Sequence, residues 1–484
     1  MLPTIADAPA SLLTLTPLCV DLDGTLVKSD TLHDSLLVLL RTHPAKALAL
    51  PAKVLRGKAA FKSFVTDSVS LDVAHLPYNR TLLHYLQNEY TRGRTIYLAT
   101  GADARLAQRV ADHLGIFAGV VGSDGETNLT GSNKLDRLRS HFPSSAFDYI
   151  GNDSPDLPLL AHSAEPMIAN PSLRLRMGLR ARGILPARTF NERENPLKSF
   201  LSSIRVHQWA KNALIFLPLL LAHDLHVSRA LSALLAFCCF SLAASATYIL
   251  NDLVDIEADR RHLSKRLRPF ASGDLSAMQG LAISAAFLAM AIFGMRFLPV
   301  PFSLWLLVYL STTILYTGYL KRIPLVDVLI LSGLYTLRLL AGGAATHTPI
   351  SQWLAGFSVF LFLSLGIVKR FAELENLRAS SSPPGNDRGY VVRDLEQLRS
   401  FGTASAYAAV VIFAIYITGH DVIALYRFPG RLWLVVPLMI LWLNRVWLLA
   451  SRGELDEDPV VFAITDPMSL LIGIGTAVIV LLAI

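Results

Sequence analysis

The chain has few cysteines and few charged residues for its length. Only three of its 484 residues are Cys, and Cys19, Cys238 and Cys239 lie in apolar runs, so the sequence offers neither a disulfide framework nor a metal-ligand spacing. Charged residues make up 17% of the chain against 52% hydrophobic residues, and the mean hydropathy is +0.45. Such a composition excludes an ordinary soluble enzyme and predicts a membrane protein.

Apolar runs long enough to cross a bilayer are absent from about the first 200 residues and frequent afterwards. The first part is typical of a soluble α/β domain, and the second predicts an all-α polytopic membrane domain of nine helices. The expected spans are residues 212–222, 229–250, 277–295, 299–318, 323–346, 352–368, 403–422, 430–450 and 467–484. We therefore expect two domains, 1–170 and 205–484, joined by a basic, interface-lying linker at 171–204.

Basic residues of the expected loops lie mainly on one side of the membrane. Lys and Arg are frequent in loops 251–276, 319–323, 369–402 and 451–466, and scarce in loops 223–228, 296–301, 346–351 and 420–431. The positive-inside rule then predicts a multi-pass protein of the cell inner (cytoplasmic) membrane with a cytoplasmic N-terminal domain. No cleavable signal peptide is expected, because TPLCVDLDGTL runs from an apolar strand into acidic residues. These loops account for much of the net charge of +7, so nucleic-acid binding is not indicated.

The stretch LCVDLDGTLVKSD places Asp21 and Asp23 where a short buried strand is expected to end. Open α/β sheets bind ligands there, although Asp-Gly is also common in plain turns. The stretch resembles the first motif of the haloacid dehalogenase (HAD) superfamily, and residues 28–90 resemble the small helical cap of that superfamily. The resemblance implies that Asp21 is a nucleophile toward phosphate, that Asp23 is the general acid/base, and that both serve Mg²⁺.

Three later stretches match the same superfamily in order. Thr100 in RTIYLATGAD fits the phosphate-holding hydroxyl, and Lys134 in GSNKLDRL fits the lysine that neutralises the aspartyl and phosphate charges. In DYIGNDSPDLPLL the usual first acid falls on Asn152, which leaves Asp156 in register and Asp153 as a substitute metal ligand. The resemblance implies a Rossmannoid phosphatase domain, and a degenerate, non-catalytic domain stays open because of Asn152.

A second acidic motif, NDLVDIEAD, follows the second expected span. If that helix continues, Asp252, Asp255 and Asp259 fall at i, i+3 and i+7 and form one stripe. Clustered carboxylates repel one another unless cations bridge them, and their hard oxygens suit Mg²⁺ that carries a diphosphate. The alternative is a solvated helix with i, i+4 ion pairs.

The motif resembles the NDxxDxxxD motif of the UbiA superfamily of intramembrane prenyltransferases, a nine-helix fold, over about residues 200–484. IRVHQWAKNALIF looks like the RPxQWxKN signature of the decaprenyl-phosphate phosphoribosyltransferase branch, with Val206 in place of Pro. DRRHLSKRLRPFASG, YTGYLKRIPLVDVLI, VKRFAEL and ELDEDPVVFAITDP are also similar to that branch. Other members usually carry a second acidic motif after helix six, where this chain has Lys369 and Arg370, which suit an additional anionic group.

The resemblance implies transfer of 5-phosphoribose from phosphoribosyl diphosphate to polyprenyl phosphate, with Mg²⁺ and the aspartate stripe holding the leaving diphosphate. The implied substrate-binding residues are Arg205, Lys211, Asn212, Asn251, Lys265, Arg266, Arg268, Tyr316, Lys321, Asp327, Arg338, Lys369 and Arg370. Asp327 and Arg338 lie near one face of the fifth expected helix, and for both an ordinary pairing within the protein is an equal alternative.

The expected transfer product still carries its 5-phosphate, so a fused phosphatase suggests two consecutive steps that end in polyprenyl-phosphoryl-ribose. One alternative is a UbiA-type enzyme that moves a prenyl group from a prenyl diphosphate to an aromatic or other acceptor, beside an unrelated or inactive HAD-like domain. A transporter is disfavoured, because the sequence shows no convincing internal repeat. The expected partners are polyprenyl phosphate, phosphoribosyl diphosphate and the membrane, and the lipid length and a homo-oligomer stay open.

Overall fold

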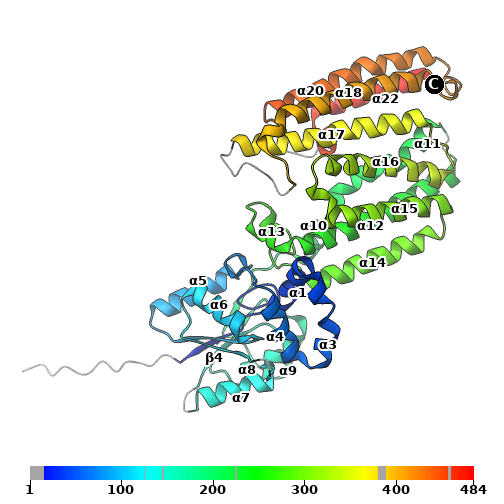
Figure 1. Ribbon diagram of the computed structural model, residues 1–484. Helices are drawn as coiled ribbons and strands as arrows, with labels where there is room; N and C mark the ends of the chain where they lie inside the picture. Colours follow the sequence, from blue (N-terminus) through cyan, green and yellow to red (C-terminus); the bar gives the residue numbers. More distant parts are fainter. Residues whose placement is uncertain (1–15, 125, 144–145, 224–225, 380–387, 456–458) are drawn as a thin grey trace, which may run out of the picture. The chain divides into compact units, whose positions relative to one another are not determined.

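The computed structural model describes residues 16–484 except 125, 144–145, 224–225, 380–387 and 456–458. The chain forms two compact units, which Figure 1 shows as ribbons. Unit 1 comprises Met1–Ile204 and Ile249–Ile283, and unit 2 comprises Arg205–Tyr248 and Ser284–Ile484. The segment that follows the second expected span therefore belongs to unit 1, although the sequence placed it in the membrane domain.

Unit 1 is built on a six-stranded parallel sheet with the strand order β3-β2-β1-β4-β5-β6. The strands are β1 (Leu18–Val20), β2 (Ile96–Asp103), β3 (Gly119–Ser123), β4 (Asp148–Gly151), β5 (Pro166–Ala169) and β6 (Arg188–Phe190). The strand order reverses between β1 and β4, and open α/β sheets bind ligands beyond the carboxyl ends of the strands at such a point. The expected α/β class is confirmed, and so is the expected strand before Asp21.

Apolar side chains of both faces of the sheet are buried, which explains why the strands are apolar without alternation. Leu18 and Val20 belong to one core cluster, together with Leu82, whereas Cys19 belongs to a second cluster with Leu138. The helices of the N-terminal part are α1 (Thr31–Thr42), α2 (Pro44–Ala47), α3 (Leu50–Leu55), α4 (Lys58–Ser68), α5 (Arg80–Thr91), α6 (Ala104–Leu114), α7 (Ser132–His141), α8 (Leu157–His162), α9 (Leu173–Ala181) and α10 (Pro196–Ser203). Residues 28–90 are largely helical, as the sequence predicts.

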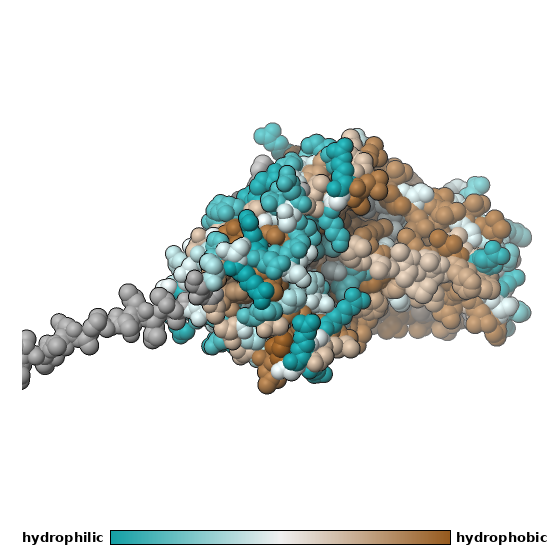
Figure 2. All heavy atoms as spheres, turned by 90° about the horizontal axis from the view of Figure 1, so that it is seen from below, coloured by the Kyte–Doolittle hydropathy of each residue, from teal (hydrophilic) through white to brown (hydrophobic). Residues whose placement is uncertain are grey.

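Unit 2 is all-α. Its longer helices are α12 (Val227–Val254), α14 (Ala277–Met295), α15 (Val300–Gly318), α16 (Val326–Thr346), α17 (Gln352–Ala379), α18 (Leu395–Ile417), α20 (Val435–Ser451) and α22 (Pro467–Ala483). Shorter ones are α11 (Leu217–Leu221), α19 (His420–Ile423) and α21 (Pro459–Thr465). The last residues of α12 and the first residues of α14 are counted in unit 1. Figure 2 shows brown, hydrophobic side chains gathered over these helices.

Seven helices in the described residues are long and apolar enough to cross a membrane, and α22 is a shorter apolar helix of 17 residues. The first expected span, 212–222, is not one long helix. It consists of the end of the 3₁₀ helix η3 (Val206–Phe216) and the five residues of α11, which is too short to cross a bilayer. Seven helices are thus confirmed by length and composition, and the expected total of nine spans stays a prediction.

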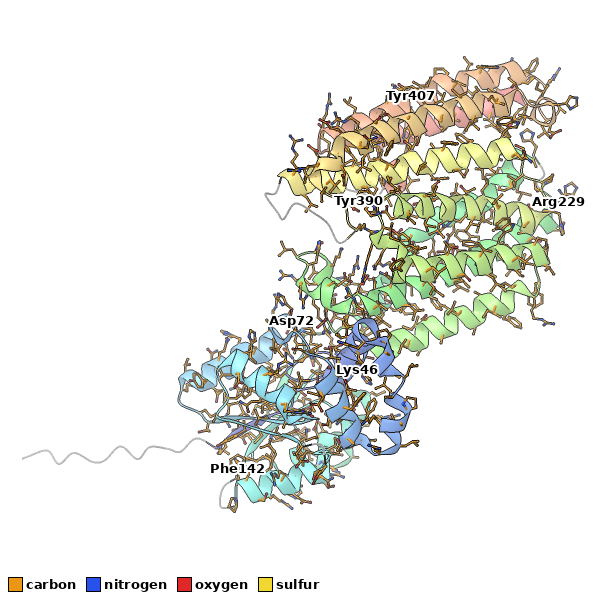
Figure 3. The ribbon with its side chains drawn as sticks, in the orientation of Figure 1. Lys46, Asp72, Phe142, Arg229, Tyr390 and Tyr407 are labelled. Atoms are coloured by element: carbon orange, nitrogen blue, oxygen red, sulfur yellow. The ribbon has the colours of Figure 1, made fainter. Side chains whose placement is uncertain are left out.

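The segment 251–276, which we call the acidic loop, folds onto the N-terminal part of unit 1. It contains α13 (Ile256–Arg261) and the 3₁₀ helix η4 (Lys265–Leu267). The buried guanidinium of Arg260 donates to Asp34 Oδ2 at 2.8 Å and to Ser29 Oγ at 3.1 Å. Its neighbour Arg261 donates to Asp72, which is labelled in Figure 3, at 2.7 Å. These contacts join two segments that are more than 180 residues apart in the sequence.

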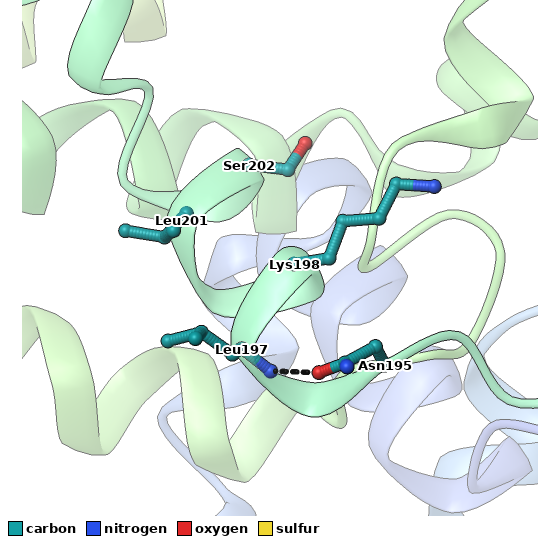
Figure 4. A pocket seen from close by; sticks show the side chains of 5 residues that line it. All are labelled: Asn195, Leu197, Lys198, Leu201 and Ser202. Atoms are coloured by element: carbon teal, nitrogen blue, oxygen red, sulfur yellow. Dashed lines mark hydrogen bonds between the residues drawn. The ribbon is translucent and has the colours of Figure 1, made fainter.

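The sheet continues beyond residue 170, so the expected boundary of the first domain lies too early. Helix α9 buries Leu175 and Leu179 in the core, and β6 extends the sheet to Phe190. The linker thus shortens to the residues around α10, which carry Leu197 and Leu201 at i and i+4. Figure 4 shows these two leucines pointing to one side and Lys198 to the other. Leu197 is 65% exposed and Leu201 47%, which suits the expected interfacial segment.

Candidate functional site

The residue Asp21 follows β1 directly and lies in a buried network of polar side chains. Lys134 Nζ, from α7, donates to Asp21 Oδ1 at 2.8 Å, to the Tyr149 hydroxyl at 2.9 Å and to Asp156 Oδ1 at 3.4 Å. The Tyr149 hydroxyl donates in turn to Asp156 Oδ1 at 2.8 Å. All four side chains are buried. The structure therefore brings together Asp21, Lys134 and Asp156, which the sequence singled out, and adds Tyr149, which it did not.

Burial and nearby charges shift the pKa values of Asp21 and Lys134 in opposite directions. Burial raises the pKa of Asp21 to about 6, although Lys134 acts against the shift. Burial alone would lower the pKa of Lys134, but the adjacent Asp21 and Asp156 raise it above its usual value. Lys134 thus stays an ammonium at neutral pH and holds one oxygen of Asp21, which fixes the direction in which the other oxygen can act.

The second aspartate of the motif, Asp23, lies between β1 and α1, and its side chain contacts the first residue of α1. Its Oδ1 accepts a hydrogen bond from the Thr31 backbone N–H at 2.8 Å. Burial, followed by the nearby charge of Asp30, raises the pKa of Asp23 to about 8. A carboxyl group with a pKa near neutrality can both give and accept a proton, as a general acid/base must.

The asparagine at the position of the usual first acid lies against the Asp21 loop. A Cβ atom at Gly24 would lie 2.0 Å from Nδ2 of Asn152, and Gly24 has φ +74°, so glycine is required there. Asp153 is exposed, and its Oδ1 accepts from Ser154 N at 2.7 Å and from Ser172 Oγ at 2.6 Å. These bonds give Asp153 a helix-capping role through Oδ1. Its expected role as a substitute metal ligand stays a prediction.

The fourth expected residue, Thr100, is fully buried in β2. Its Oγ1 accepts a hydrogen bond from the Ala102 backbone N–H at 3.0 Å. This bond fixes the hydroxyl rotamer near the carboxyl end of a strand that pairs with β1. The position is the one that the sequence predicted, beyond which a ligand of the sheet would bind.

The acidic loop brings two of its three predicted aspartates together. Asp252 and Asp259 are buried, and Nη1 of Arg268 donates to Asp252 Oδ1 at 3.2 Å and to Asp259 Oδ2 at 2.7 Å. Burial raises the pKa of Asp259, whereas Arg268 acts against the shift. The shared guanidinium is what allows two carboxylates to be buried side by side. Arg268, expected to bind phosphate, binds these two carboxylates in the structure, and its phosphate role stays a prediction.

The third aspartate of the stripe has a different position. Helix α12 ends at Val254, and α13 begins at Ile256, so Asp255 stands at the break and is half-buried. Asn251 is also half-buried, and its carbonyl oxygen accepts from the Asp255 N–H at 2.9 Å. Lys265 and Arg266 are exposed. The expected continuous helix is therefore interrupted at one residue, although the Asp259 N–H still donates to the Asp255 carbonyl oxygen at 2.9 Å. The role of Asp255 in the expected stripe stays a prediction.

The carboxylates of the acidic loop and those that follow β1 are suitable ligands for Mg²⁺. In the described part of the chain, no three His, Cys, Asp or Glu side chains form a metal-binding group. Mg²⁺ usually keeps several waters and takes one or two carboxylates together with substrate phosphates. Asp252 and Asp259 could supply such a pair in the acidic loop, and Asp21 and Asp23 could supply one beyond β1. A three-carboxylate cage does not match the geometry of the described residues.

A polar cluster lies within unit 2 around Arg338 of α16. The guanidinium donates to Asn212 Oδ1 at 2.7 Å and lies 5.0 Å from the centroid of the Tyr309 ring. Asn212 donates to Ser241 Oγ at 3.0 Å, and Lys211 Nζ lies 5.7 Å from the centroid of the Tyr335 ring. Sequence analysis predicted Lys211, Asn212 and Arg338 but missed Tyr309, since nothing in its apolar helix marks it.

A second buried cluster of unit 2 joins Asp327 and Arg370. Arg370 Nε donates to Asp327 Oδ2 at 2.6 Å, and the Tyr390 hydroxyl donates to Asp327 Oδ1. Nη1 of Arg370 also donates to Glu373 at 2.7 Å. Both Asp327 and Arg338 are therefore paired within the protein, as the alternative interpretation predicted, and Arg370 is held by two carboxylates.

Of the remaining predicted residues of unit 2, three lie near helix ends, whereas Lys369 lies inside α17, which continues beyond the expected loop start at 369. The guanidinium of Arg205 lies 5.3 Å from the centroid of the Tyr248 ring. The Tyr316 hydroxyl accepts from Arg388 Nη1 at 2.7 Å and from Arg370 Nη2 at 3.4 Å. Lys321, in the 3₁₀ helix η5 (Leu320–Arg322), and Lys369 are half-buried.

Comparisons with known proteins assign the helical part. Residues 213–471 match the model of the UbiA prenyltransferase family. The uncharacterized protein y4nM of Sinorhizobium fredii is 37% identical over 462 residues, which cover 94% of this chain and 89% of that protein. A decaprenyl-phosphate phosphoribosyltransferase of Mycobacterium tuberculosis is 31% identical over 238 residues, 47% of this chain and 76% of that protein.

Among solved structures, a UbiA homolog from Archaeoglobus fulgidus bound to GPP and Mg²⁺ covers 58% of this chain and 99% of its own, with 18% identity and a TM-score of 0.45. The family model covers more than half of the 484 residues, and the described residues contain seven apolar helices. The chain is thus an integral membrane protein that belongs to the UbiA prenyltransferase family.

Proposed function

We propose that the chain transfers 5-phosphoribose from phosphoribosyl diphosphate to polyprenyl phosphate and then removes the 5-phosphate. Family membership supports a transferase, and the similarity to a protein named decaprenyl-phosphate phosphoribosyltransferase supports this donor and acceptor. The observation that carries the proposal is the buried pair Asp252 and Asp259, joined by Arg268 within the acidic loop. Buried acids paired through a cation are suited to an anionic ligand that arrives with Mg²⁺.

In the transfer step, the bond between the anomeric carbon and the diphosphate oxygen breaks, and a phosphate oxygen of the lipid bonds to that carbon. Mg²⁺ would neutralise the charge of the leaving diphosphate. Asp252 and Asp259 would hold the Mg²⁺-diphosphate, and Arg268, once released from one carboxylate, would donate to a diphosphate oxygen. The acceptor phosphate is already an anion and needs no base.

Cationic residues of unit 2 would bind phosphate oxygens of the substrates. Arg338 is buried and Lys211 half-buried, and each lies within about 6 Å of an aromatic ring, so their charges are less screened by water than at an open surface. Arg370 already binds Asp327 and Glu373. We assign Arg370 the role of holding α17 against Asp327 of α16, next to Lys369, and not that of holding phosphate itself.

The phosphatase step would use the HAD-like arrangement of unit 1. Asp21 Oδ2, which accepts a long hydrogen bond of 3.4 Å from Thr25 Oγ1, attacks the 5-phosphate. The bond from phosphorus to the ribose oxygen breaks, and Asp23 gives that oxygen its proton. Asp23 then takes a proton from water, whose oxygen attacks phosphorus and releases phosphate from Asp21. Lys134 and Thr100 would hold phosphate oxygens, and the raised pKa of Asp23 suits both proton transfers.

A UbiA-type prenyl transfer to an aromatic or other acceptor is the second candidate, and the family match favours it equally. Membranes that contain the protein should convert labelled phosphoribosyl diphosphate and polyprenyl phosphate into a labelled lipid. No labelled lipid from this pair, with product formed from a prenyl diphosphate, would reject the first candidate. An inner-membrane location with a cytoplasmic N-terminal domain is part of the proposal, since phosphoribosyl diphosphate is a soluble donor.

The aspartate pair provides the sharpest variant for this assay. Asp259→Asn should lower the transfer rate by about 100-fold, because the diphosphate loses charge stabilisation at the leaving group. Glu257→Gln is the matched control, since Glu257 lies in the same helix and bonds the Asp72 backbone N–H at 3.3 Å. Equal rates for the two variants would remove the aspartate pair from the mechanism.

A further inference from the structure

A cavity of about 730 Å³ opens in unit 1, and the function proposed above does not use it. Its walls come from the N-terminal part and from the acidic loop. The charged residues of the wall are Lys28, Arg80, Lys198, Arg260 and Arg266, with Glu192, Glu194 and Asp274. Asp21, Asp23, Thr100 and Lys134 do not belong to its lining. The cavity is therefore distinct from the place where Asp21 would act.

Three of the five cations in the wall are neutralised by carboxylates. Lys28 pairs with Asp274 at 3.4 Å, and Lys198 pairs with Glu194 at 2.9 Å. Arg260 pairs with Asp34 at 2.8 Å. In the described part of the chain, the guanidinium groups of Arg80 and Arg266 have no carboxylate partner, and both residues are exposed. Two free guanidinium groups in one cavity favour an anion with several oxygens.

The carboxylates of the wall indicate what else the ligand carries. Asp274 Oδ2 accepts from Ser272 Oγ at 2.6 Å, and Glu192 accepts from the backbone of Arg80 and Thr81. These oxygens keep free lone pairs, which accept hydrogen bonds from hydroxyl groups. Inorganic phosphate would use Arg80 and Arg266 but not the lone pairs of these carboxylates, and a volume of about 730 Å³ lies in the range of small-molecule sites.

We propose that this cavity binds a phosphorylated sugar, with the phosphate on Arg80 and Arg266 and the sugar hydroxyls on Glu192, Glu194 and Asp274. The proposal rests on the proposed function for the identity of the sugar, a pentose 5-phosphate. The ligand is either a free sugar phosphate or the headgroup of the lipid that the transfer step produces. In the second case the cavity keeps the headgroup at unit 1 before dephosphorylation.

Calorimetric titration tests the proposal without any turnover. Ribose 5-phosphate is titrated into the full-length Asp21→Asn protein in detergent, and the same titration follows with Arg80→Gln added. The loss of one charged hydrogen-bonding group should weaken binding by about tenfold. The matched control is Arg139→Gln, because Arg139 is an exposed arginine of α7 outside the cavity. Equal dissociation constants for the Arg80 and Arg139 variants would overturn the proposal.

Two further titrations define the ligand. Inorganic phosphate should bind more weakly than ribose 5-phosphate, and equal affinities would overturn the assignment to a sugar. In the last titration, ribose 5-phosphate is added to the protein in nanodiscs that contain polyprenyl-phosphoryl-phosphoribose. The apparent dissociation constant of ribose 5-phosphate should rise if the lipid headgroup occupies the cavity, and should stay unchanged if the ligand is a free sugar phosphate. Either result supports binding of a phosphorylated sugar in the cavity and identifies whether the sugar is free or attached to the lipid. Because no transfer is measured, a failure of the proposed transferase reaction would leave these results intact.

Discussion

Asp21 shows most clearly how one residue divides the proposed pathway. It lies at the carboxyl end of β1, and Lys134 holds one of its oxygens at 2.8 Å while Thr25 donates to the other at 3.4 Å. The hydrolytic step needs a nucleophile from the protein, whereas the lipid phosphate is the nucleophile of the transfer step. Its substitution should therefore separate the two reactions.

Asp21→Asn should abolish hydrolysis of the 5-phosphate while phosphoribosyl transfer continues. The amide oxygen cannot attack phosphorus effectively, so polyprenyl-phosphoryl-phosphoribose should accumulate in place of polyprenyl-phosphoryl-ribose. Thin-layer separation of lipids labelled from phosphoribosyl diphosphate measures both species. Asp112→Asn is the control, since Asp112 is an exposed residue of α6 that bonds Gln108. An unchanged ratio of the two lipids in the Asp21 variant would contradict the two-step proposal.

Lys134 is proposed to hold a phosphate oxygen, and its buried charge should also stabilise the fold. Its ammonium is buried between Asp21 and Asp156, at 2.8 Å and 3.4 Å. Lys134→Met leaves two buried carboxylates without a cation, which should lower the free energy of unfolding by about 3–5 kcal/mol. Thermal unfolding in detergent measures the loss. Adding Asp156→Asn removes one of the stranded charges and should restore part of the stability, whereas a further decrease would show that Lys134 is not the balancing charge.

At the scale of elements, α13 carries two adjacent arginines with different surroundings. Arg260 and Asp34 form a pair whose side chains are 4% and 2% exposed, whereas Arg261 and Asp72 are 55% and 23% exposed. Breaking a buried ion pair leaves a charge without water or partner, while an exposed pair contributes little. The attachment of the acidic loop to the N-terminal part of unit 1 therefore depends chiefly on Arg260.

Arg260→Met should destabilise unit 1 by about 3–5 kcal/mol, because Asp34 loses its cation, and Arg261→Met should cost only about 0–1 kcal/mol. Thermal unfolding of the two variants, followed by limited proteolysis of the acidic loop, measures the difference. Equal stabilities would mean that the loop is held by its apolar contacts. Asp34→Asn in the Arg260→Met background should recover stability, since an amide is cheaper to bury than an unpaired carboxylate.

Local pattern predicted some elements well and others not at all. The strand β1 and Asp21 were predictable because a short apolar run ends in acids, and the aspartates of the acidic loop were predictable from their i, i+3 and i+7 spacing. The break at Asp255 was not, because NDLVDIEAD contains no glycine or proline that would mark it. Strand β6 was missed since two of its three residues are exposed and lie in a basic stretch.

Other features could not be predicted because they depend on contacts between segments that are distant in the sequence. The bond between Arg260 and Asp34 joins residues 226 positions apart, and no periodicity marks either partner. Tyr149 is part of the apolar strand β4, and its hydroxyl accepts a hydrogen bond from Lys134 of α7, which the sequence does not show. Motif spacing therefore located the candidate site residues, whereas the residues that contact them came from the fold.

For the whole molecule, the orientation in the membrane decides whether the proposed reaction sequence can occur. The acidic loop belongs to unit 1 together with Asp21, so both must face the same compartment. The positive-inside rule predicts that this compartment is the cytoplasm. Helix α14 follows the acidic loop and is long and apolar enough to reach the other side.

Substituted-cysteine labelling checks this orientation. Leu263→Cys in the acidic loop and Arg296→Cys after α14 both place a thiol at an exposed position. In spheroplasts, a membrane-impermeable maleimide should label Cys at position 296 and not at position 263, and both should react after the membrane is opened by detergent. The unmodified chain is the control for its own three cysteines. Labelling of position 263 in intact spheroplasts would reverse the topology and would separate the proposed site from cytoplasmic phosphoribosyl diphosphate.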